Sequence, residues 1–126
     1  MLRVKQMAGS YRDLVAWRKA MILAKEIYLA TQVFPKDEIY GLRRQLRRAA
    51  VSVPSNIAEG RARYSRAEFH RFLITSRGSL AEVETQLMLS SDLEYLGRTE
   101  AEVLLDKAAE LGRILKGLIA FTKSEA

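Results

Sequence analysis

Apolar residues recur at alternating intervals of three and four along most of the chain, and no segment alternates in the manner of a β-strand. The period predicts four helices, over about residues 13–33, 38–62, 66–93 and 99–122. Long amphipathic helices joined by short loops predict an all-α fold, an up-down-up-down antiparallel four-helix bundle over residues 11–122. Residues 1–10 are expected to be a flexible tail and 123–126 a frayed C-terminus, and either Met1 or Met7 can serve as the native start.

Local signals mark the ends of these helices. Pro35 disfavours helical geometry at Phe34 and separates the first two helices. Ser65 with Glu68, and Thr99 with Glu102, have the spacing of capping boxes. The second helix contains Pro54, which predicts a kink there, or alternatively two shorter helices broken near Ser52. The kinked helix is favoured because its polar and apolar strips stay in phase across the proline.

The first helix is expected to bury one seam and to carry a second apolar stripe. The seam comprises Leu14, Trp17, Met21, Ala24, Tyr28 and Thr31, and the stripe comprises Val15, Ile22 and Leu29. A helix with two apolar sides is expected to pack against other protein surfaces on both of them. In the third helix, Gly78 and Ser79 predict a close helix approach.

A polar strip about 80° wide runs along the second helix beside its apolar strip. Because a half-buried polar group needs a partner, we expect these residues to form a structural network, with Arg48 paired to Glu59 or Glu82. The predicted network comprises Gln45, Arg48, Ser52, Asn56, Glu59, Ser79 and Glu82. The alternative, a hidden active site, is disfavoured because these groups include no base-activated nucleophile, so no catalytic residue is predicted and no enzymatic activity is expected.

The outer side of the same helix changes character along its length. Its first half shows arginines, whereas its second half shows Val51, Pro54 and Ala58. An apolar outer surface on a helix that is already covered on one side indicates a second contact. We therefore expect the chain to contact another copy of itself there.

The net charge of +6 is concentrated in the middle of the chain. Residues 41–77 carry nine basic and two acidic groups, whereas residues 78–126 carry five basic and nine acidic groups. Such asymmetry favours an anionic partner, with nucleic acid as the first candidate, and the competing interpretation is a set of solvated or ion-paired arginines. The predicted nucleic-acid-binding residues are Arg43, Arg44, Arg47, Arg61, Arg63, Arg66, His70 and Arg77. Tyr64 is the one aromatic residue interleaved with them, which predicts contacts to the phosphate backbone and weak sequence specificity.

The composition argues against disulfides, metal or cofactor sites and membrane spans. The chain has no cysteine, which rules out a disulfide or a thiolate metal site and fits a cytoplasmic location. With one histidine and no Glu-x-x-His motif, neither a metal nor another cofactor is predicted. No run of about 18 apolar residues is present, so no membrane span is expected.

Several motifs follow one another in a characteristic order. They are Tyr40-Gly41-Leu42, Arg47-Arg48-Ala49-Ala50, Pro54-Ser55-Asn56-Ile57-Ala58-Glu59-Gly60, Glu68-Phe69, Arg71-Phe72-Leu73 and Gly78-Ser79-Leu80 with Glu82. From about Tyr11 to Leu96 the chain resembles the family of 23S ribosomal RNA intervening-sequence proteins, also called the ribosomal protein S23 family. It departs from the family at Thr75-Ser76-Arg77, where a more apolar run is expected.

The resemblance implies a fold rather than an activity. Family members are encoded within intervening sequences of bacterial ribosomal RNA genes or stand alone, and they form up-down bundles that assemble as ring-shaped homopentamers. A similar bundle is the accessory protein of diversity-generating retroelements, where it binds nucleic acid and a reverse transcriptase. Two hypotheses follow: a non-enzymatic RNA- or DNA-binding homo-oligomer, or a scaffold whose ring recruits another protein.

Overall fold

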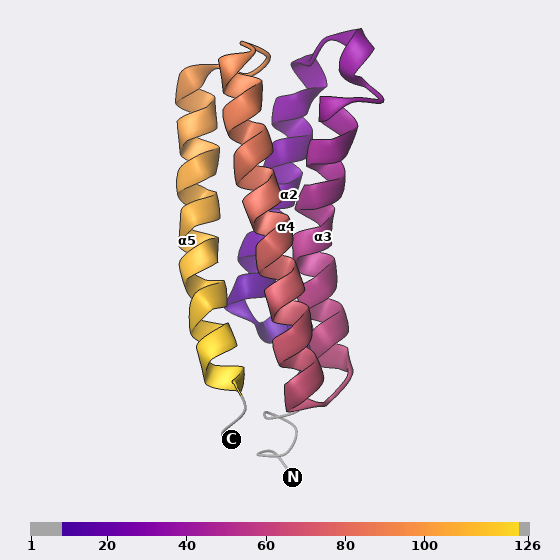
Figure 1. Cartoon of the computed structure of the whole chain (residues 1–126), viewed down its shortest axis with the longest axis vertical. Helices are drawn as coiled ribbons and strands as arrows, with labels where there is room; N and C mark the ends of the chain where they lie inside the picture. The colour runs from indigo at the N-terminus through magenta and orange to yellow at the C-terminus, as the bar shows by residue number, and fades with distance from the viewer. Residues whose placement is uncertain (1–8, 124–126) are drawn as a thin grey trace.

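The computed structural model describes residues 9–123, and within them it contains four α-helices and no strand. The long helices are α2 (Val15–Ala30), α3 (Leu42–Ala62), α4 (Arg66–Asp92) and α5 (Arg98–Thr122). Short 3-10 turns lie at Tyr11–Asp13 (η1), Thr31–Val33 (η2) and Lys36–Glu38 (η3). Figure 1 shows the four helices side by side, with the chain direction alternating from each helix to the next. The predicted four-helix bundle is confirmed.

The second helix begins at Leu42 instead of residue 38, and its start has a local cause. The segment before it forms the turn η3, and the Glu38 carboxylate accepts a hydrogen bond of 2.9 Å from the Leu42 amide. A carboxylate at this place satisfies one of the free N–H groups at the helix start. From Leu42 the helix runs unbroken through Pro54, so the alternative of two shorter helices is wrong, while the bend at Pro54 stays a prediction.

The helix ends confirm one predicted cap and correct another. The Ser65 hydroxyl accepts a hydrogen bond from the Glu68 amide at 3.2 Å, which confirms Ser65 as the N-cap. The reciprocal half of the capping box is not formed in the described chain, because the Glu68 carboxylate accepts from Arg63 and Arg71 and not from the Ser65 amide. Thr99 is not a cap, because α5 starts one residue earlier and Gly97 occupies the N-cap position. Ser10, expected in the tail, caps η1 by accepting from the Arg12 amide at 3.1 Å. The rest of the tail through residue 8, and residues 124–126, lie outside the described part of the chain.

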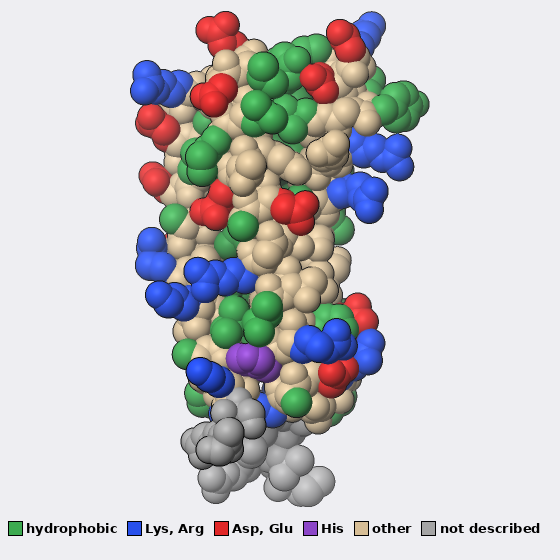
Figure 2. All heavy atoms as spheres, in the orientation of Figure 1, with side chains coloured by type: hydrophobic (Ala, Val, Ile, Leu, Met, Phe, Trp, Pro, Cys, Tyr) green, Lys and Arg blue, Asp and Glu red, His purple; other side chains and the backbone are tan. Residues whose placement is uncertain are grey.

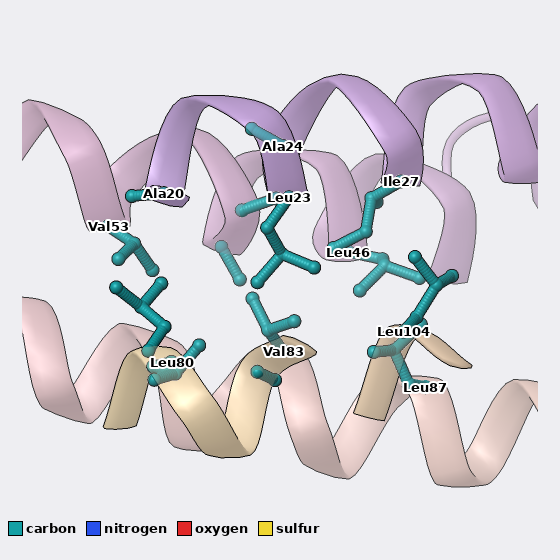
Figure 3. Packing of buried hydrophobic residues seen from close by; sticks show 14 of the residues in the cluster. Ala20, Leu23, Ala24, Ile27, Leu46, Val53, Leu80, Val83, Leu87 and Leu104 are labelled. Atoms are coloured by element: carbon teal, nitrogen blue, oxygen red, sulfur yellow. The ribbon is translucent and has the colours of Figure 1, made fainter. Parts of the chain in front are cut away.

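All four helices contribute aliphatic side chains to one core (Figure 3). Leu46 and Ile57 of α3, Leu73 of α4 and Leu115 of α5 are fully buried. The seam of α2 lies partly elsewhere than predicted, because Ala20, Leu23 and Ile27 face the core whereas Met21 and Tyr28 are exposed. Trp17 packs against the core from its edge, with its ring 5.2 Å from that of Tyr11.

The close approach of α3 and α4 occurs at Gly60. A Cβ atom built on Gly60 would lie 2.5 Å from Cβ of Phe72, whereas one on Gly78 would meet nothing within 4 Å. The expectation for Gly78 was therefore wrong: that residue is exposed on the outer side of α4. Ser79 beside it is buried against α3, as the hydrogen bonds described below show. None of the described helices is long and apolar enough to cross a membrane.

Candidate nucleic-acid interface

An open groove of about 530 Å³ runs between α2 and the first half of α3. Four arginines share it with an aromatic residue, two aliphatic residues and a serine. We call this the arginine groove, and its lining consists of Tyr28, Ile39, Arg43, Arg44, Arg47, Arg48, Val51 and Ser52. Arginines at positions i, i+1, i+4 and i+5 of one helix gather on one side because a turn contains about 3.6 residues.

Arg47 is fixed in this groove by contacts with α2. Its Nε donates to the Thr31 hydroxyl and its Nη2 donates to the Tyr28 carbonyl oxygen, both at 2.9 Å. Its guanidinium carbon lies 4.4 Å from the centroid of the Tyr28 ring, a cation–π geometry. Contrary to the sequence expectation, Arg47 does not point freely outward, because α2 offers it a hydroxyl, a carbonyl and a ring.

The positive charge of the groove is not neutralised by any carboxylate in the described part of the chain. Among the described residues, no carboxylate forms an ion pair with Arg43, Arg44, Arg47 or Arg48. Partial burial of the Arg47 guanidinium, together with the neighbouring charge of Arg43, holds the pKa of Arg47 below its usual value. Arg47 remains charged at neutral pH, and a bound anion would relieve this repulsion.

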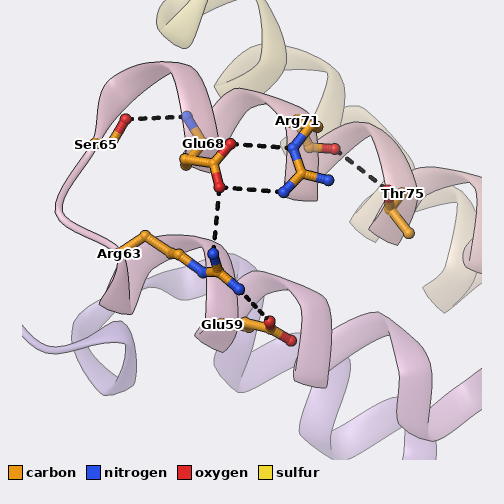
Figure 4. Close-up of polar contacts among 6 residues, drawn as sticks. All are labelled: Glu59, Arg63, Ser65, Glu68, Arg71 and Thr75. Atoms are coloured by element: carbon orange, nitrogen blue, oxygen red, sulfur yellow. Dashed lines mark hydrogen bonds and ion pairs between the residues drawn. The ribbon is translucent and has the colours of Figure 1, made fainter.

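The arginines at the other end of α3 have the opposite surroundings (Figure 4). Arg63 pairs with Glu59 at 2.9 Å and with Glu68 at 3.4 Å, and Arg71 donates two hydrogen bonds of 3.1 Å to Glu68. The hydrogen bonds from Arg71 hold the pKa of Glu68 below its usual value. This network joins the end of α3 to the start of α4 across a turn in which Tyr64 has a φ of 53°.

Other predicted basic residues near this end also contact the protein. Arg61 lies 5.9 Å from the Phe69 ring, and Arg66 donates to the Phe121 carbonyl and lies 5.2 Å from the ring of that residue. A ring nitrogen of His70 lies 3.0 Å from the Thr122 hydroxyl. Arg61 thus joins α3 to α4, and Arg66 and His70 join α4 to the end of α5. Arg47 and Arg61 are separated by about 21 Å along the axis of α3, so the eight predicted residues do not form one patch.

Arg77 belongs to a third region, on the α4–α5 side. It lines a groove of about 350 Å³ with Arg113, Lys116 and Glu84. Sequence reasoning missed Arg113 and Lys116 because the last third of the chain is acidic on average. On the face that Figure 2 displays, basic side chains lie in separate groups, most of them along the two edges, and not in one continuous stripe.

The polar strip of α3 is only partly a network within the chain. Ser52 and Ser79 share a hydrogen bond of 2.8 Å between their hydroxyls, and the Asn56 amide donates to the Ser52 hydroxyl at 2.9 Å. Gln45, Arg48, Glu59 and Glu82 are exposed. The predicted pair of Arg48 with Glu59 or Glu82 is not formed in the described chain, because Glu59 lies one turn from Arg63 and pairs with it.

Ser76 supplies a contact that the sequence did not indicate. It is fully buried, and its hydroxyl donates a hydrogen bond of 2.9 Å to the Val53 carbonyl, next to Pro54. This explains a polar residue within the run Thr75-Ser76-Arg77. It binds the backbone of α3 where the helix passes through a proline.

The predicted outer apolar surface of α3 is smaller than expected. Val51 is exposed and Ala58 is half-buried, but Pro54 is buried within the chain. Pro54 lies seven residues after Arg47, on the same side of the helix, and Arg47 reaches α2. Pro54 therefore faces the side that α2 and η1 cover.

The arrangement defines an all-helical bundle with a basic groove on its surface whose arginines have no described carboxylate partner. Residues 9–123 contain no group of three or more His, Cys, Asp or Glu side chains suited to a metal ion. The sequence matches the 23S rRNA-intervening sequence proteins over residues 12–117. The chain belongs to this family. No curated protein shows significant sequence similarity to it.

A solved structure supports the fold independently. It is the crystal structure of a protein of unknown function from the S23 ribosomal protein family of Bacteroides thetaiotaomicron. The two share 24% sequence identity with a TM-score of 0.75, over 83% of this chain and 98% of the other. At this identity the likeness establishes the helical fold alone.

Proposed function

We propose that the protein is a non-enzymatic nucleic-acid-binding bundle that holds RNA by its phosphate backbone in the arginine groove. The observation that carries this proposal is the gathering of four arginines with no carboxylate partner among residues 9–123. A guanidinium group forms two charge-assisted hydrogen bonds with one phosphate, so this lining suits a polyanion. Membership of a family named for ribosomal RNA intervening sequences fits an RNA partner.

The test is the affinity for RNA measured across salt concentrations by fluorescence anisotropy. Binding by three or four arginines predicts a plot of log affinity against log salt with a slope of about −2 to −3. The variant Arg43→Glu with Arg44→Glu should lower the affinity by about 100-fold at low salt. A flat salt response, or no binding at about 50 mM salt, would contradict the proposal.

A matched control separates the groove from net charge. The double change Arg98→Glu with Lys123→Glu alters the net charge equally, at exposed positions outside the groove. Its affinity should fall by much less, because beyond a Debye length of about 10 Å at 0.1 M salt, charges are largely screened. Equal losses for both variants would show that binding is a property of overall charge.

A second proposal, that the bundle is a homo-oligomer and a scaffold for a protein partner, rests on α2. Val15, Ile22 and Leu29 form an apolar stripe on its outer side and are exposed by 49%, 53% and 55%. Ion pairs of Lys19 with Glu110 and of Lys107 with Glu26 lie beside this stripe. Sedimentation should show an oligomer at micromolar concentration, and Ile22→Lys should dissociate it. A monomer would contradict this second proposal.

A further inference from the structure

The arginine groove has walls that phosphate binding alone does not require. Tyr28, Ile39 and Val51 line it among the arginines, and their exposed fractions are 41%, 40% and 42%. Phosphate oxygens gain nothing from aliphatic or aromatic neighbours, whereas a nucleobase stacks on an aromatic or guanidinium plane. The groove therefore combines charge with surfaces that suit a flat, apolar group.

The stacking surface is already assembled without a ligand. Arg47 lies over the Tyr28 ring and is held by two hydrogen bonds to α2. Thr31, one of its acceptors, is buried and itself donates to the Ile27 carbonyl at 2.8 Å. Because this side chain is ordered in advance, binding there costs little additional conformational entropy.

The guanidinium N–H donors in the groove that form no bond within the described chain suit the phosphates that flank such a base. A guanidinium carries five N–H donors, of which Arg47 spends two on α2. Arg43, Arg44 and Arg48 line the groove without a carboxylate partner in the described chain. At about 530 Å³, the groove has a volume in the range of sites that hold a small ligand, about 300–1,000 Å³.

A single strand and a duplex differ in whether they can contact both the arginines and the aromatic wall of the groove. In a duplex the bases are stacked and paired inside, so its phosphates would reach the arginines while the aromatic wall stayed empty. An unpaired strand can place a base in the groove and its phosphates on the rim. We propose that the arginine groove holds an unpaired RNA segment, with one base stacked on the Tyr28–Arg47 pair and the flanking phosphates bound by Arg43, Arg44 and Arg48. This rests on the proposed function and narrows it to single-stranded regions.

The experiment compares a single-stranded RNA without self-pairing with a duplex RNA of equal length, by anisotropy with the full chain. The single strand should bind at least about tenfold more tightly, and Tyr28→Ala should remove most of that difference while leaving duplex affinity unchanged. Tyr28→Phe, which keeps the ring, should bind like the original chain. Arg47→Lys, which keeps the charge and loses the planar group, should weaken the single strand selectively.

Tyr64→Asn is the matched control, since it removes an exposed tyrosine at the far end of α3. Asparagine tolerates the φ of 53° found there, so the turn should be retained. Its preference for the single strand should equal that of the original chain. Circular dichroism melting of each variant verifies that the bundle is folded.

Each contrary outcome has a distinct meaning. Equal, salt-dependent binding of both RNAs, with no effect of Tyr28→Ala, would overturn the stacking inference and leave the proposed function standing. No binding of either RNA would overturn both. If oligoglutamate competes as well as RNA of equal charge, or if Tyr28→Ala dissociates an oligomer without changing RNA affinity, the occupant is an acidic chain or a second copy, and the inference is wrong.

Discussion

The two ends of α3 carry the same residue type in opposite circumstances. At the first half of the helix, four arginines line one groove and meet no carboxylate of the described chain. Directly after the last residue of the helix, Arg63 joins Glu59 and Glu68 in a network that also includes Arg71 of α4. Under the proposed function the first set retains its charge for a bound polyanion, whereas the second set pairs with acids that join α3 to α4 across a turn. The acids nearby, and not the number of arginines, make the two ends different, and on this basis we propose the groove and not the turn as the site for a polyanion.

The largest expected effect on stability comes from disturbing the packing of α3 against α4 at the end of α3 that leads into the turn. Gly60→Ala would place a Cβ atom 2.5 Å from Cβ of Phe72, so the helices must separate. Overpacking costs about 1–3 kcal/mol, against about 1 kcal/mol gained from the helix propensity of alanine. We expect a net loss of up to about 2 kcal/mol in the free energy of unfolding, measured with urea, while affinity for RNA at the distant groove is retained.

Gly78→Ala provides the control for this change. Its Cβ atom would meet nothing within 4 Å, so only the propensity gain remains. The free energy of unfolding should rise by about 0.5–1 kcal/mol. Equal effects of the two substitutions would show that α3 and α4 are not in close contact at Gly60.

The middle of α3, between the two ends, is probed by Ser79→Ala. This change removes the 2.8 Å hydrogen bond to the Ser52 hydroxyl while Asn56 still donates to Ser52. We expect a loss of about 1 kcal/mol in the free energy of unfolding. Ser52→Ala with Ser79→Ala should cost less than the sum of the single changes in a double-mutant cycle, because both single changes break the same bond. Strict additivity would contradict a direct contact.

The smallest expected effect is on the pH dependence of stability, and it arises at the second end of α3, where Glu68 pairs with arginines. Because the pKa of Glu68 is lower in the folded chain than its ordinary value of 4.5, its contribution to stability is complete above that value. The contribution is lost as the pH falls through the lower, folded-state pKa. Glu68→Gln should therefore flatten the acid side of the stability profile measured by thermal melting at a series of pH values. An unchanged acid profile would show that the Arg71–Glu68 pair contributes nothing.

The fold was predictable because apolar residues recur with the period of a helix in all four segments, although this spacing predicted the buried face of α2 only in part. Helix starts were less predictable: the carboxylate that caps α3 comes from Glu38 in a separate turn, and no local spacing indicates that it accepts from Leu42. The polar strip was predicted as a unit, but of its α3 residues only Ser52 forms a hydrogen bond with α4 in the described chain, through the Ser79 hydroxyl, and Asn56 bonds to Ser52 within α3.

The candidate site shows the same limit more clearly. Helical periodicity grouped Arg43, Arg44 and Arg47, but Tyr28 was expected in the seam of the first helix. Only the packing of α2 beside α3 places the Tyr28 ring 4.4 Å from the Arg47 guanidinium. Partners from different helices are set by tertiary contacts, so sequence spacing cannot reveal them.

The most direct test of the difference between the two ends is modification of arginines by phenylglyoxal, with and without RNA, mapped by mass spectrometry. Arg44 and Arg48 in the groove, and Arg63 and Arg71 at the turn, are all exposed, so each can react in the free protein. Bound RNA should protect Arg44 and Arg48 and leave the reactivity of Arg63 and Arg71 unchanged. Protection of Arg63 and Arg71, with the groove arginines still reactive, would contradict the account.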